Sequence, residues 1–184
     1  ASIKNAKPDV VVIATGATHY IPDIPGADRD NVATASEILL GRKKAGKKVV
    51  IIGGGVVGSE LAWFLAEKGR KVTIVEMLGA VAMDMNMFSR LYLLDKLAEL
   101  CVDMVIDTTV RRITDKGVAA IDAEGKRKVI EADTVILAAG FKSNNSLEEK
   151  LRGMVPEVYA IGDCVKLGKI EGAVSSAWRV ARQI

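Results

Sequence analysis

The sequence is short of cysteine, of aromatic residues and of long apolar runs. Only Cys101 and Cys164 occur among its 184 residues, and no C-x-x-C pair is present. This argues against a disulfide framework and a zinc site, so we expect no bound metal and a reducing, cytoplasmic compartment. No stretch reaches the roughly 18 apolar residues of a membrane span, and the first residues lack a signal-peptide pattern. We therefore expect no membrane partner.

The excess of basic over acidic residues is also small. The formal net charge is +3, and the basic residues form short, scattered clusters with few aromatic residues between them. Such clusters are typical of solvated loops, which argues against nucleic acid as a partner. The 49% hydrophobic content instead indicates a folded core. Because the sequence opens with Ala1 and enters an apolar strand soon afterwards, we expect a piece of a longer protein.

The chain is organised around residues 48–76. Residues 49–52, VVII, form a β-branched run, which predicts a strand buried on both faces of a parallel sheet. The run leads into Gly53, Gly55 and Gly58, which fit G-x-G-x-x-G. In that pattern the first glycine permits a tight turn, the second lets backbone approach a pyrophosphate, and the third lets the next helix pack against its strand. The turn predicts a dinucleotide site.

A helix and a second strand follow the glycines. We expect the helix from Val56 to Lys68, with Gly69 as its C-terminal stop. Its first N–H groups carry roughly half a positive charge, which favours a phosphate. The next strand, residues 72–75, ends at Glu76, at about the 20-residue distance at which this fold presents a carboxylate to an adenosine ribose. A βαβ unit whose glycines serve only packing explains neither the number of glycines nor this acid.

Two strands with similar endings bracket this unit. Residues 9–15 end in Ala14-Thr15 and are followed by Gly16, and residues 133–139 end in Ala138-Ala139 and are followed by Gly140. Small residues at a strand end let the backbone lie against a flat ligand or a neighbouring strand. The bracketing predicts one domain inserted into another.

The other elements follow from periodicity and turn residues. One predicted helix has Asp84 as its N-cap and an apolar stripe that buries Met87, Leu91, Leu94, Ala98 and Cys101. A third parallel strand is predicted at 102–106, and residues 108–132 indicate a three-stranded antiparallel meander. We expect a short helix at 34–40 with Ser36 as its N-cap, and His19 in a surface loop.

The C-terminal part adds a strand and a helix. A strand at 158–161 leads to Gly162-Asp163, and a helix is predicted over 172–184. The Asp163 carboxylate either caps the following segment or binds a ribose or polyhydroxyl chain, and the sequence favours neither alternative.

This order of signals resembles the flavoproteins with two dinucleotide-binding domains, in which an NAD(P)H domain interrupts an FAD domain. The similarity is greatest to the C-terminal part of the NADH:flavin oxidoreductases related to 2,4-dienoyl-CoA reductase and 2-enoate reductase. It is carried by the segments PDVVVIATGATHYIPDIPG, KKVVIIGGGVVGSELAWFLAEKG, ADTVILAAGFKSNNSL and VYAIGDCV. The resemblance implies an α/β fold with FAD-domain segments at 1–43 and 142–184 around an NADH-binding, Rossmann-like domain at 44–141.

The resemblance also implies roles for particular residues. The pyrophosphate of NADH would lie on the glycine turn and the first helical turn, the adenosine ribose on Glu76, and the nicotinamide end near Glu60. The helix dipole alone also favours a carboxylate at Glu60, so both readings stay open. The NADH residues are Gly53, Gly55, Val56, Val57, Gly58, Glu60 and Glu76. The flavin-side residues are Ala14, Thr15, Gly16, Ala139, Gly140, Gly162 and Asp163.

Departures from the family pattern limit what the chain does alone. An earlier G-x-G-x-x-G for FAD is missing, as are the FMN barrel and the cysteine-ligated iron–sulfur cluster of the dienoyl-CoA reductase group. We therefore expect the chain to bind NADH, to hold FAD weakly or not at all, and to be inactive alone, with FMN and a 4Fe-4S cluster in an N-terminal barrel module of the same protein. None of its residues is expected to act as a catalytic nucleophile.

The sequence also favours NADH over NADPH. Glu76 would repel a 2′-phosphate, and residues 77–80 offer no arginine to compensate. Alternatives remain: part of a pyridine nucleotide-disulfide oxidoreductase or of an NADH oxidase, a methyltransferase with a similar glycine loop, or a non-catalytic nucleotide-binding module.

Overall fold

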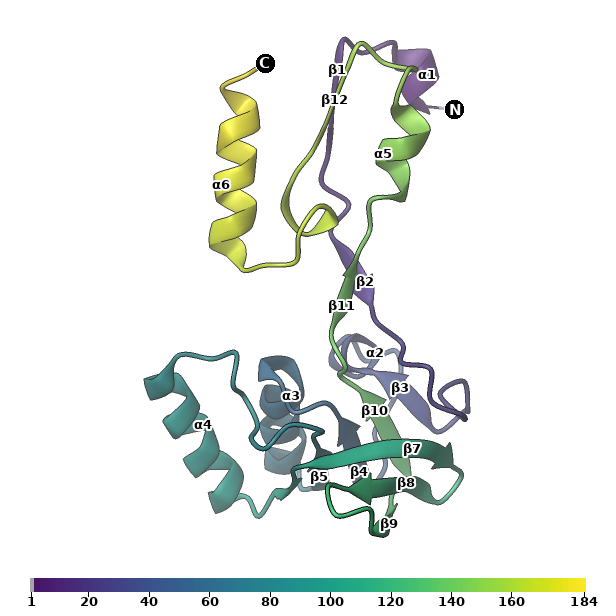
Figure 1. Ribbon diagram of the computed structural model, residues 1–184, viewed down its shortest axis with the longest axis vertical. Helices are drawn as coiled ribbons and strands as arrows, with labels where there is room; N and C mark the ends of the chain where they lie inside the picture. Colours follow the sequence, from purple (N-terminus) through teal and green to yellow (C-terminus); the bar gives the residue numbers. More distant parts are fainter. Residues whose placement is uncertain (1) are drawn as a thin grey trace. The chain divides into compact units, whose positions relative to one another are not determined.

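The computed structural model describes residues 2–184, which form two compact units (Figure 1). One unit contains the residues up to Tyr20 together with Phe141–Ile184, and the other contains Ile21–Gly140. We call them the flanking unit and the central unit. Segment 21–43 therefore belongs to the central unit. That residues 1–43 and 142–184 belong to an FAD domain and residues 44–141 to an NADH domain stays a prediction.

A five-stranded parallel sheet forms the centre of the central unit, in the order β3-β10-β4-β5-β6. The strands are β3 (Val32–Thr34), β10 (Thr134–Leu137), β4 (Lys48–Ile52), β5 (Lys71–Val75) and β6 (Asp103–Val105). β4 and β10 were both predicted from apolar runs, and they pair in register with Ile52 opposite Leu137. The chain thus brings the two runs together from positions far apart in sequence.

Both faces of this sheet are covered, which explains why its strands are continuously apolar. On one face Val49 and Ile51 join a core that includes Leu61 and Leu65 of α3 (Val56–Glu67). Helices α2 (Ala35–Leu39) and α4 (Met87–Glu99) contribute to the same core. On the other face the alternate residues of β4 pack against the antiparallel sheet β7-β8-β9.

The antiparallel sheet is the predicted meander. It contains β7 (Thr108–Thr114), β8 (Gly117–Asp122) and β9 (Arg127–Glu131). Its buried Val110, Ile113 and Val118 face the central sheet, whereas Val129 of β9 is exposed. The predicted fold class, an α/β Rossmann-like domain with a parallel sheet and a three-stranded meander, is confirmed.

Two predicted helix caps are wrong. Helix α2 is capped by Thr34 in a capping box with Glu37, so Ser36 lies inside the helix. Helix α4 is capped by Asn86, whose Oδ1 accepts a hydrogen bond from the Ser89 N–H at 3.0 Å. Asn and Asp are equally good N-caps, and Asp84 is engaged elsewhere.

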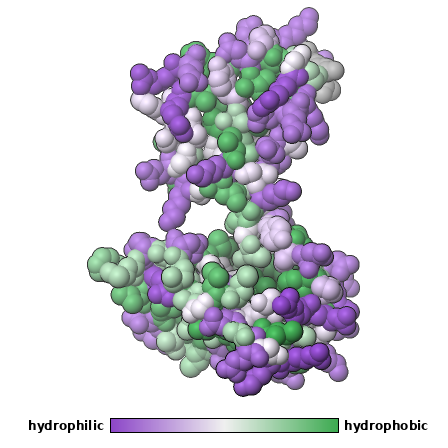
Figure 2. All heavy atoms as spheres, in the orientation of Figure 1, coloured by the Kyte–Doolittle hydropathy of each residue, from purple (hydrophilic) through white to green (hydrophobic). Residues whose placement is uncertain are grey.

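The buried face of α4 also differs from the prediction. Leu93 and Leu97 are buried and the predicted Leu94 packs partly buried against the same core, whereas Met87 and Leu91 are 66% and 52% exposed. The other stripe of the helix therefore faces the sheet, and Figure 2 shows apolar atoms gathered on the surface where α4 lies in Figure 1. Cys101, predicted to be buried, is exposed. It follows the end of the helix with a φ of 54°, a conformation typical of the residue after a helix C-cap.

The flanking unit contains two small sheets. β1 (Val10–Ile13) pairs in parallel with β12 (Glu157–Ala160), and β2 (Ala17–His19) pairs antiparallel with β11 (Phe141–Ser143). His19 thus lies in a strand instead of a loop, half-buried, with its ring centroid 4.8 Å from that of Phe141. Four short elements complete the unit: α1 (Ser2–Ala6), α5 (Ser146–Leu151), η1 (Gly162–Cys164) and α6 (Ile170–Ala181).

The core of the flanking unit is small. Ile13, Leu151 and Cys164 are its buried members. The Cys164 thiol lies 3.3 Å from the carbonyl oxygen of Ile13 and 3.0 Å from that of Ile161, as a donor to both. Within residues 2–184, no helix is long and apolar enough to cross a bilayer.

Candidate dinucleotide-binding site

The three glycines of the turn after β4 have different steric surroundings. Gly53 has a φ of +105°, and a Cβ there would lie 2.5 Å from the carbonyl oxygen of Ala138. A Cβ on Gly58 would lie 2.0 Å from the carbonyl oxygen of Gly53, so the helix packs directly on the turn. The steric tasks predicted for these two glycines, tight turn and helix–strand packing, are confirmed.

Gly55 is different, because its backbone does not require glycine. As N-cap of α3 it has φ −65° and ψ −177°, an extended conformation open to any residue. The nearest atoms to an added Cβ are the carboxylate oxygens of Asp84, at 3.7 Å, which is ordinary contact. The space above Gly55 is thus free of backbone, as close approach of a phosphate requires.

The N-terminus of α3 already receives a negatively charged group. The first N–H groups of a helix have no partner within the helix, and they carry the positive end of its dipole. Oδ1 of Asp84 accepts a hydrogen bond from one of them, the Val56 N–H, at 2.9 Å. Val57 belongs to the same turn and is exposed. This end of the helix is therefore an anion-binding position.

Glu76 follows β5 directly and is only 8% exposed. Its Oε2 accepts a hydrogen bond from the Gly54 N–H at 2.6 Å, and its Oε1 accepts one from the Leu78 N–H at 2.8 Å. Each carboxylate oxygen has two lone pairs, so both retain capacity for a further donor such as a sugar hydroxyl. The acid thus links the glycine turn to the next loop.

Residues 77–86 pack against the glycine turn. The Ala82 N–H donates to the Gly54 carbonyl oxygen at 2.6 Å, and Val81 lies where a Cβ on Gly54 would stand. Beneath the turn, the buried Ser59 hydroxyl donates to the same carbonyl oxygen at 3.0 Å. These contacts fix the turn from both sides.

Glu60 is exposed and lies in the second turn of α3. The dipole argument for a carboxylate at this position is weaker there, since the effect falls off within the first turn. Glu60 lines a concave surface between α3 and α4 together with Trp63, Phe88 and Tyr92.

The flavin-side residues after β1 lie in the flanking unit. Ala14 and Thr15 are exposed, and Gly16 has a φ of +66°. The Thr15 hydroxyl donates to the Asn144 carbonyl oxygen at 2.5 Å, and the Asn144 N–H donates to the Gly16 carbonyl oxygen at 3.0 Å. The end of β1 is thereby tied to the residue after β11. Ala139 and Gly140, which follow β10, belong to the central unit and are exposed.

Gly162 and Asp163 form the η1 turn after β12. The Gly162 N–H donates to the Ser176 hydroxyl at 2.9 Å, and a Cβ on Gly162 would lie 3.5 Å from that of Ala173 on α6. Oδ1 of Asp163 accepts a hydrogen bond from the Gly168 N–H at 3.1 Å. This hydrogen bond fits the first of its two predicted roles, capping the segment that leads to α6, whereas binding of a ribose or polyhydroxyl chain stays a prediction.

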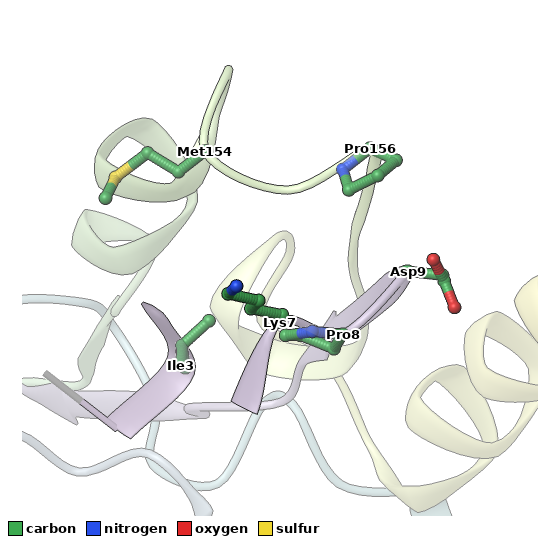
Figure 3. A pocket seen from close by; sticks show the side chains of 6 residues that line it. All are labelled: Ile3, Lys7, Pro8, Asp9, Met154 and Pro156. Carbon is green, nitrogen blue, oxygen red and sulfur yellow. The ribbon is translucent and has the colours of Figure 1, made fainter. Parts of the chain in front are cut away.

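A pocket at the opposite end of β1 and β12 contains none of the predicted site residues (Figure 3). Pro8 and Asp9 precede β1, and Pro156 precedes β12. Ligands of α/β sheets bind outside the carboxyl ends of parallel strands, where Ala14 to Gly16 and Gly162 lie. This pocket is therefore on the wrong side for a flavin.

Sequence reasoning missed some residues around the candidate site. Gly54 holds the acid of the site through its N–H, and the run of three glycines at 53–55 was a visible signal of it. Asp84 was interpreted as a cap of α4. Asp107 lies near Gly79, with a carboxylate oxygen 3.3 Å from where a Cβ on that glycine would stand.

Known proteins similar to this chain are flavoprotein-type reductases and oxidases. An NADH oxidase of Thermoanaerobacter brockii is 42% identical over 188 residues, which cover all of this chain and 29% of that protein. A cinnamate reductase of Clostridium sporogenes is 34% identical, covering all of this chain and 28% of that protein. A solved 2-naphthoyl-CoA reductase in complex with 2-naphthoyl-CoA superimposes with a TM-score of 0.93 at 36% identity, over all of this chain and 28% of that one.

These relatives confirm the resemblance to the 2-enoate reductase type of flavoprotein, and the chain spans less than a third of their length. A family model described as "Pyridine nucleotide-disulphide oxidoreductase" matches residues 3–182, which cover nearly all of the chain. A methyltransferase is thereby excluded. With its glycine turn, its acid after β5 and this match, the chain belongs to the pyridine nucleotide-disulphide oxidoreductase family.

Proposed function

We propose that this chain is the NADH-binding part of a flavin-dependent oxidoreductase in which hydride passes from NADH to FAD. Membership of the family implies NAD(P)H and FAD as cofactors. The observation that carries the proposal is Gly55: its conformation does not require glycine, yet a side chain there would fill the space over an anion-binding helix end. Packing alone gives no reason for a glycine at this position.

The residues of the glycine turn fit a dinucleotide. Gly53 and Gly58 shape the turn, Gly55 leaves room for the diphosphate, and the N–H groups of Val56 and Val57 would bind it. Glu76 would accept hydrogen bonds from the adenosine ribose with the lone pairs that Gly54 and Leu78 leave free. When bound, the reduced nicotinamide supplies a hydride and the flavin accepts it, while the chain positions both.

The proposed nucleotide is NADH, with NADPH disfavoured. A 2′-phosphate would meet the buried Glu76 carboxylate, and Asp107 places a second carboxylate beside Gly79 in the loop that follows Glu76. Met77 and Leu78, which follow the acid, are exposed apolar residues without a compensating charge. Like charges at close range cost several kcal/mol.

For FAD we propose a role for the residues at the carboxyl ends of β1 and β12 in the flanking unit. Gly162 and Asp163 would contact the ribityl or phosphate region, and small residues would leave room for the ring. The small residues of the flanking unit are Ala14, Thr15 and Gly16, whereas Ala139 and Gly140, predicted for the flavin side as well, belong to the central unit. Because a glycine-rich phosphate turn for FAD is missing from the 184 residues, we propose that this chain alone holds FAD weakly or not at all.

The substrate of the longer protein is proposed to be an unsaturated acid or its CoA ester. The similar cinnamate reductase and 2-naphthoyl-CoA reductase are named for such compounds. The proposal includes an N-terminal barrel module with FMN and a 4Fe-4S cluster as the partner within the same protein. We propose the cytoplasm as the compartment, in keeping with the free thiols Cys101 and Cys164.

The variant Gly55→Val tests the nucleotide site. Its backbone is compatible with valine and the added Cβ meets only ordinary contacts, so the free energy of unfolding should fall by no more than about 1 kcal/mol, the cost of a poorer N-cap. NADH binding, measured by calorimetric titration, should be lost because the side chain fills the space of the diphosphate. Wild-type protein that gives no heat with NADH, or a Gly55→Val variant that binds as well as wild type, would contradict the proposal.

A second candidate function is that of an NADH oxidase, which the similar Thermoanaerobacter brockii protein favours. The two functions differ in the final electron acceptor. Oxygen consumption by the full-length protein with NADH, compared with reduction of cinnamate or an enoyl-CoA under anaerobic conditions, distinguishes them. NADH binding without reduction of any acceptor would instead indicate a non-catalytic nucleotide-binding module.

A further inference from the structure

We propose that the carboxylate of Asp84 occupies the position of the dinucleotide's diphosphate at the N-terminus of α3, and must swing away before NADH binds. Asp84 would thus be an intramolecular competitor that sets the affinity of the site. The inference rests on the proposed function and adds a specificity-determining residue to it.

The contacts of Asp84 place a negative charge directly in the site. Its Oδ1 accepts a hydrogen bond from the Val56 N–H at 2.9 Å, the kind of donor that a phosphate at a helix N-terminus uses. Both carboxylate oxygens lie 3.7 Å from where a Cβ on Gly55 would stand. The space that the glycine leaves open is therefore the space over which the carboxylate lies.

The chain holds Asp84 there from both sides. Two residues before it, the Ala82 N–H bonds to the Gly54 carbonyl oxygen at 2.6 Å. Two residues after it, Asn86 caps α4. Arg90 of α4 adds a hydrogen bond from its Nε to the Val81 carbonyl oxygen at 2.9 Å. The Asp84 side chain itself is exposed, so rotation about its own bonds removes the carboxylate while these anchors stay in place.

Asp84 has opposite effects on the free and the bound protein. Gly55, the N-cap of α3, has no side chain with which to cap it, and the Asp84 carboxylate takes over this role. An acidic group at a helix N-terminus stabilises the helix. The same charge repels a diphosphate and occupies its hydrogen-bond donor. Removal of Asp84 should therefore lower stability and strengthen nucleotide binding.

This pair of opposite changes distinguishes competition from a purely structural role. A residue that only supports the fold would lose stability and binding together when it is replaced. Asp84→Asn keeps an oxygen acceptor for the Val56 N–H and removes the charge, whereas Asp84→Ala removes both. We expect NADH to bind about two- to fivefold more tightly to both variants, the range that one charge at a helix N-terminus supplies.

Two variants of the same unit serve as controls, measured in the 184-residue chain. Thr34→Ala removes the cap of α2, which should lower the denaturation midpoint without tighter NADH binding. Asp95→Asn removes an exposed charge on α4 and should leave both quantities unchanged. NADH affinity is measured by calorimetric titration, and stability by denaturant unfolding.

The outcomes separate this inference from the proposed function. Tighter NADH binding to Asp84→Asn and Asp84→Ala, with the two controls at wild-type affinity, supports the competition. If wild type binds NADH and the Asp84 variants bind it equally well or more weakly, the competition is overturned and the proposed function stays intact. If neither wild type nor any variant binds NADH, both are overturned.

Discussion

The carboxylate of Glu76 accepts a hydrogen bond from the Gly54 N–H at 2.6 Å, which ties the end of β5 to the turn that follows β4. The acid proposed for the ribose and the turn proposed for the diphosphate therefore form one rigid assembly. A change in either residue should affect both parts of the site.

Glu76 should control the choice between NADH and NADPH. We expect wild type to bind NADH at least about tenfold more tightly than NADPH, because a like-charge contact of 1.4 kcal/mol or more has this effect. Glu76→Gln should narrow the ratio, whereas the surface variant Glu99→Gln should not. Titration of each protein with both nucleotides measures this, and equal or tighter NADPH binding by wild type means that our reading of Glu76 is wrong.

Glu76→Gln should also destabilise the protein. Both oxygens of Glu76 accept backbone N–H groups, and the amide nitrogen of glutamine would face one of these donors. A buried donor without an acceptor costs about 1–3 kcal/mol. Denaturant unfolding should show a loss of this size, and an unchanged midpoint would contradict the hydrogen bonds described.

Gly58→Ala should destabilise the central unit. The new Cβ would lie 2.0 Å from the Gly53 carbonyl oxygen, so α3 must move away from the turn. Overpacking of this kind costs about 1–3 kcal/mol of unfolding free energy. Gly172→Ala in α6 is the matched control, since among residues 2–184 no atom lies within 4 Å of its Cβ, and alanine favours a helix by roughly 0.5–1 kcal/mol. Equal effects of the two substitutions would contradict the packing described.

Asp133 should make stability depend on pH in the acid range. The Lys48 N–H, assisted by the Lys47 N–H and both lysine charges, holds the pKa of Asp133 below its usual 3.8. A lowered folded-state pKa adds stability that is present above 3.8 and is lost as the pH falls through the folded value. In Asp133→Asn, the unfolding free energy should fall less steeply than in wild type as the pH drops below 3.8. The same pH dependence in both proteins would contradict this prediction.

The two cysteines should differ in reactivity. Cys101 is exposed after α4, whereas Cys164 is buried and bonded to two carbonyl oxygens. A thiol reagent should label one cysteine per native chain quickly, and the second only after unfolding. Cys101→Ser should abolish the fast phase, and rapid labelling of both thiols in native protein would show that the core of the flanking unit is open.

The purified chain should contain little or no FAD. Among the 184 residues, the segment before Ala14 contains no glycine-rich turn that could bind the phosphates of FAD. An absorbance spectrum of the purified protein should therefore lack the flavin bands, and stoichiometric FAD would contradict the expectation. Titration with added FAD measures what affinity remains.

The sequence alone determined the sheet, the meander and the glycine turn. The runs at 49–52 and 72–75 are apolar at every position, and only a strand covered on both faces buries every such residue. The task of Gly58 also follows from local sterics, because its Cβ would lie 2.0 Å from the carbonyl oxygen of Gly53, whereas the atom that crowds Gly53 itself belongs to Ala138, which follows a distant strand.

Only the tertiary structure decided which side of α4 is buried and where Asp84 binds. The helix has two apolar stripes, one through Met87 and Leu91 and one through Leu93 and Leu97, and periodicity does not tell which of them meets the sheet. The path of residues 77–86 depends on hydrogen bonds to Gly54, which precedes them by more than 20 residues. Contacts between distant segments place the Asp84 carboxylate at the N-terminus of α3, and no local sequence pattern predicts these contacts.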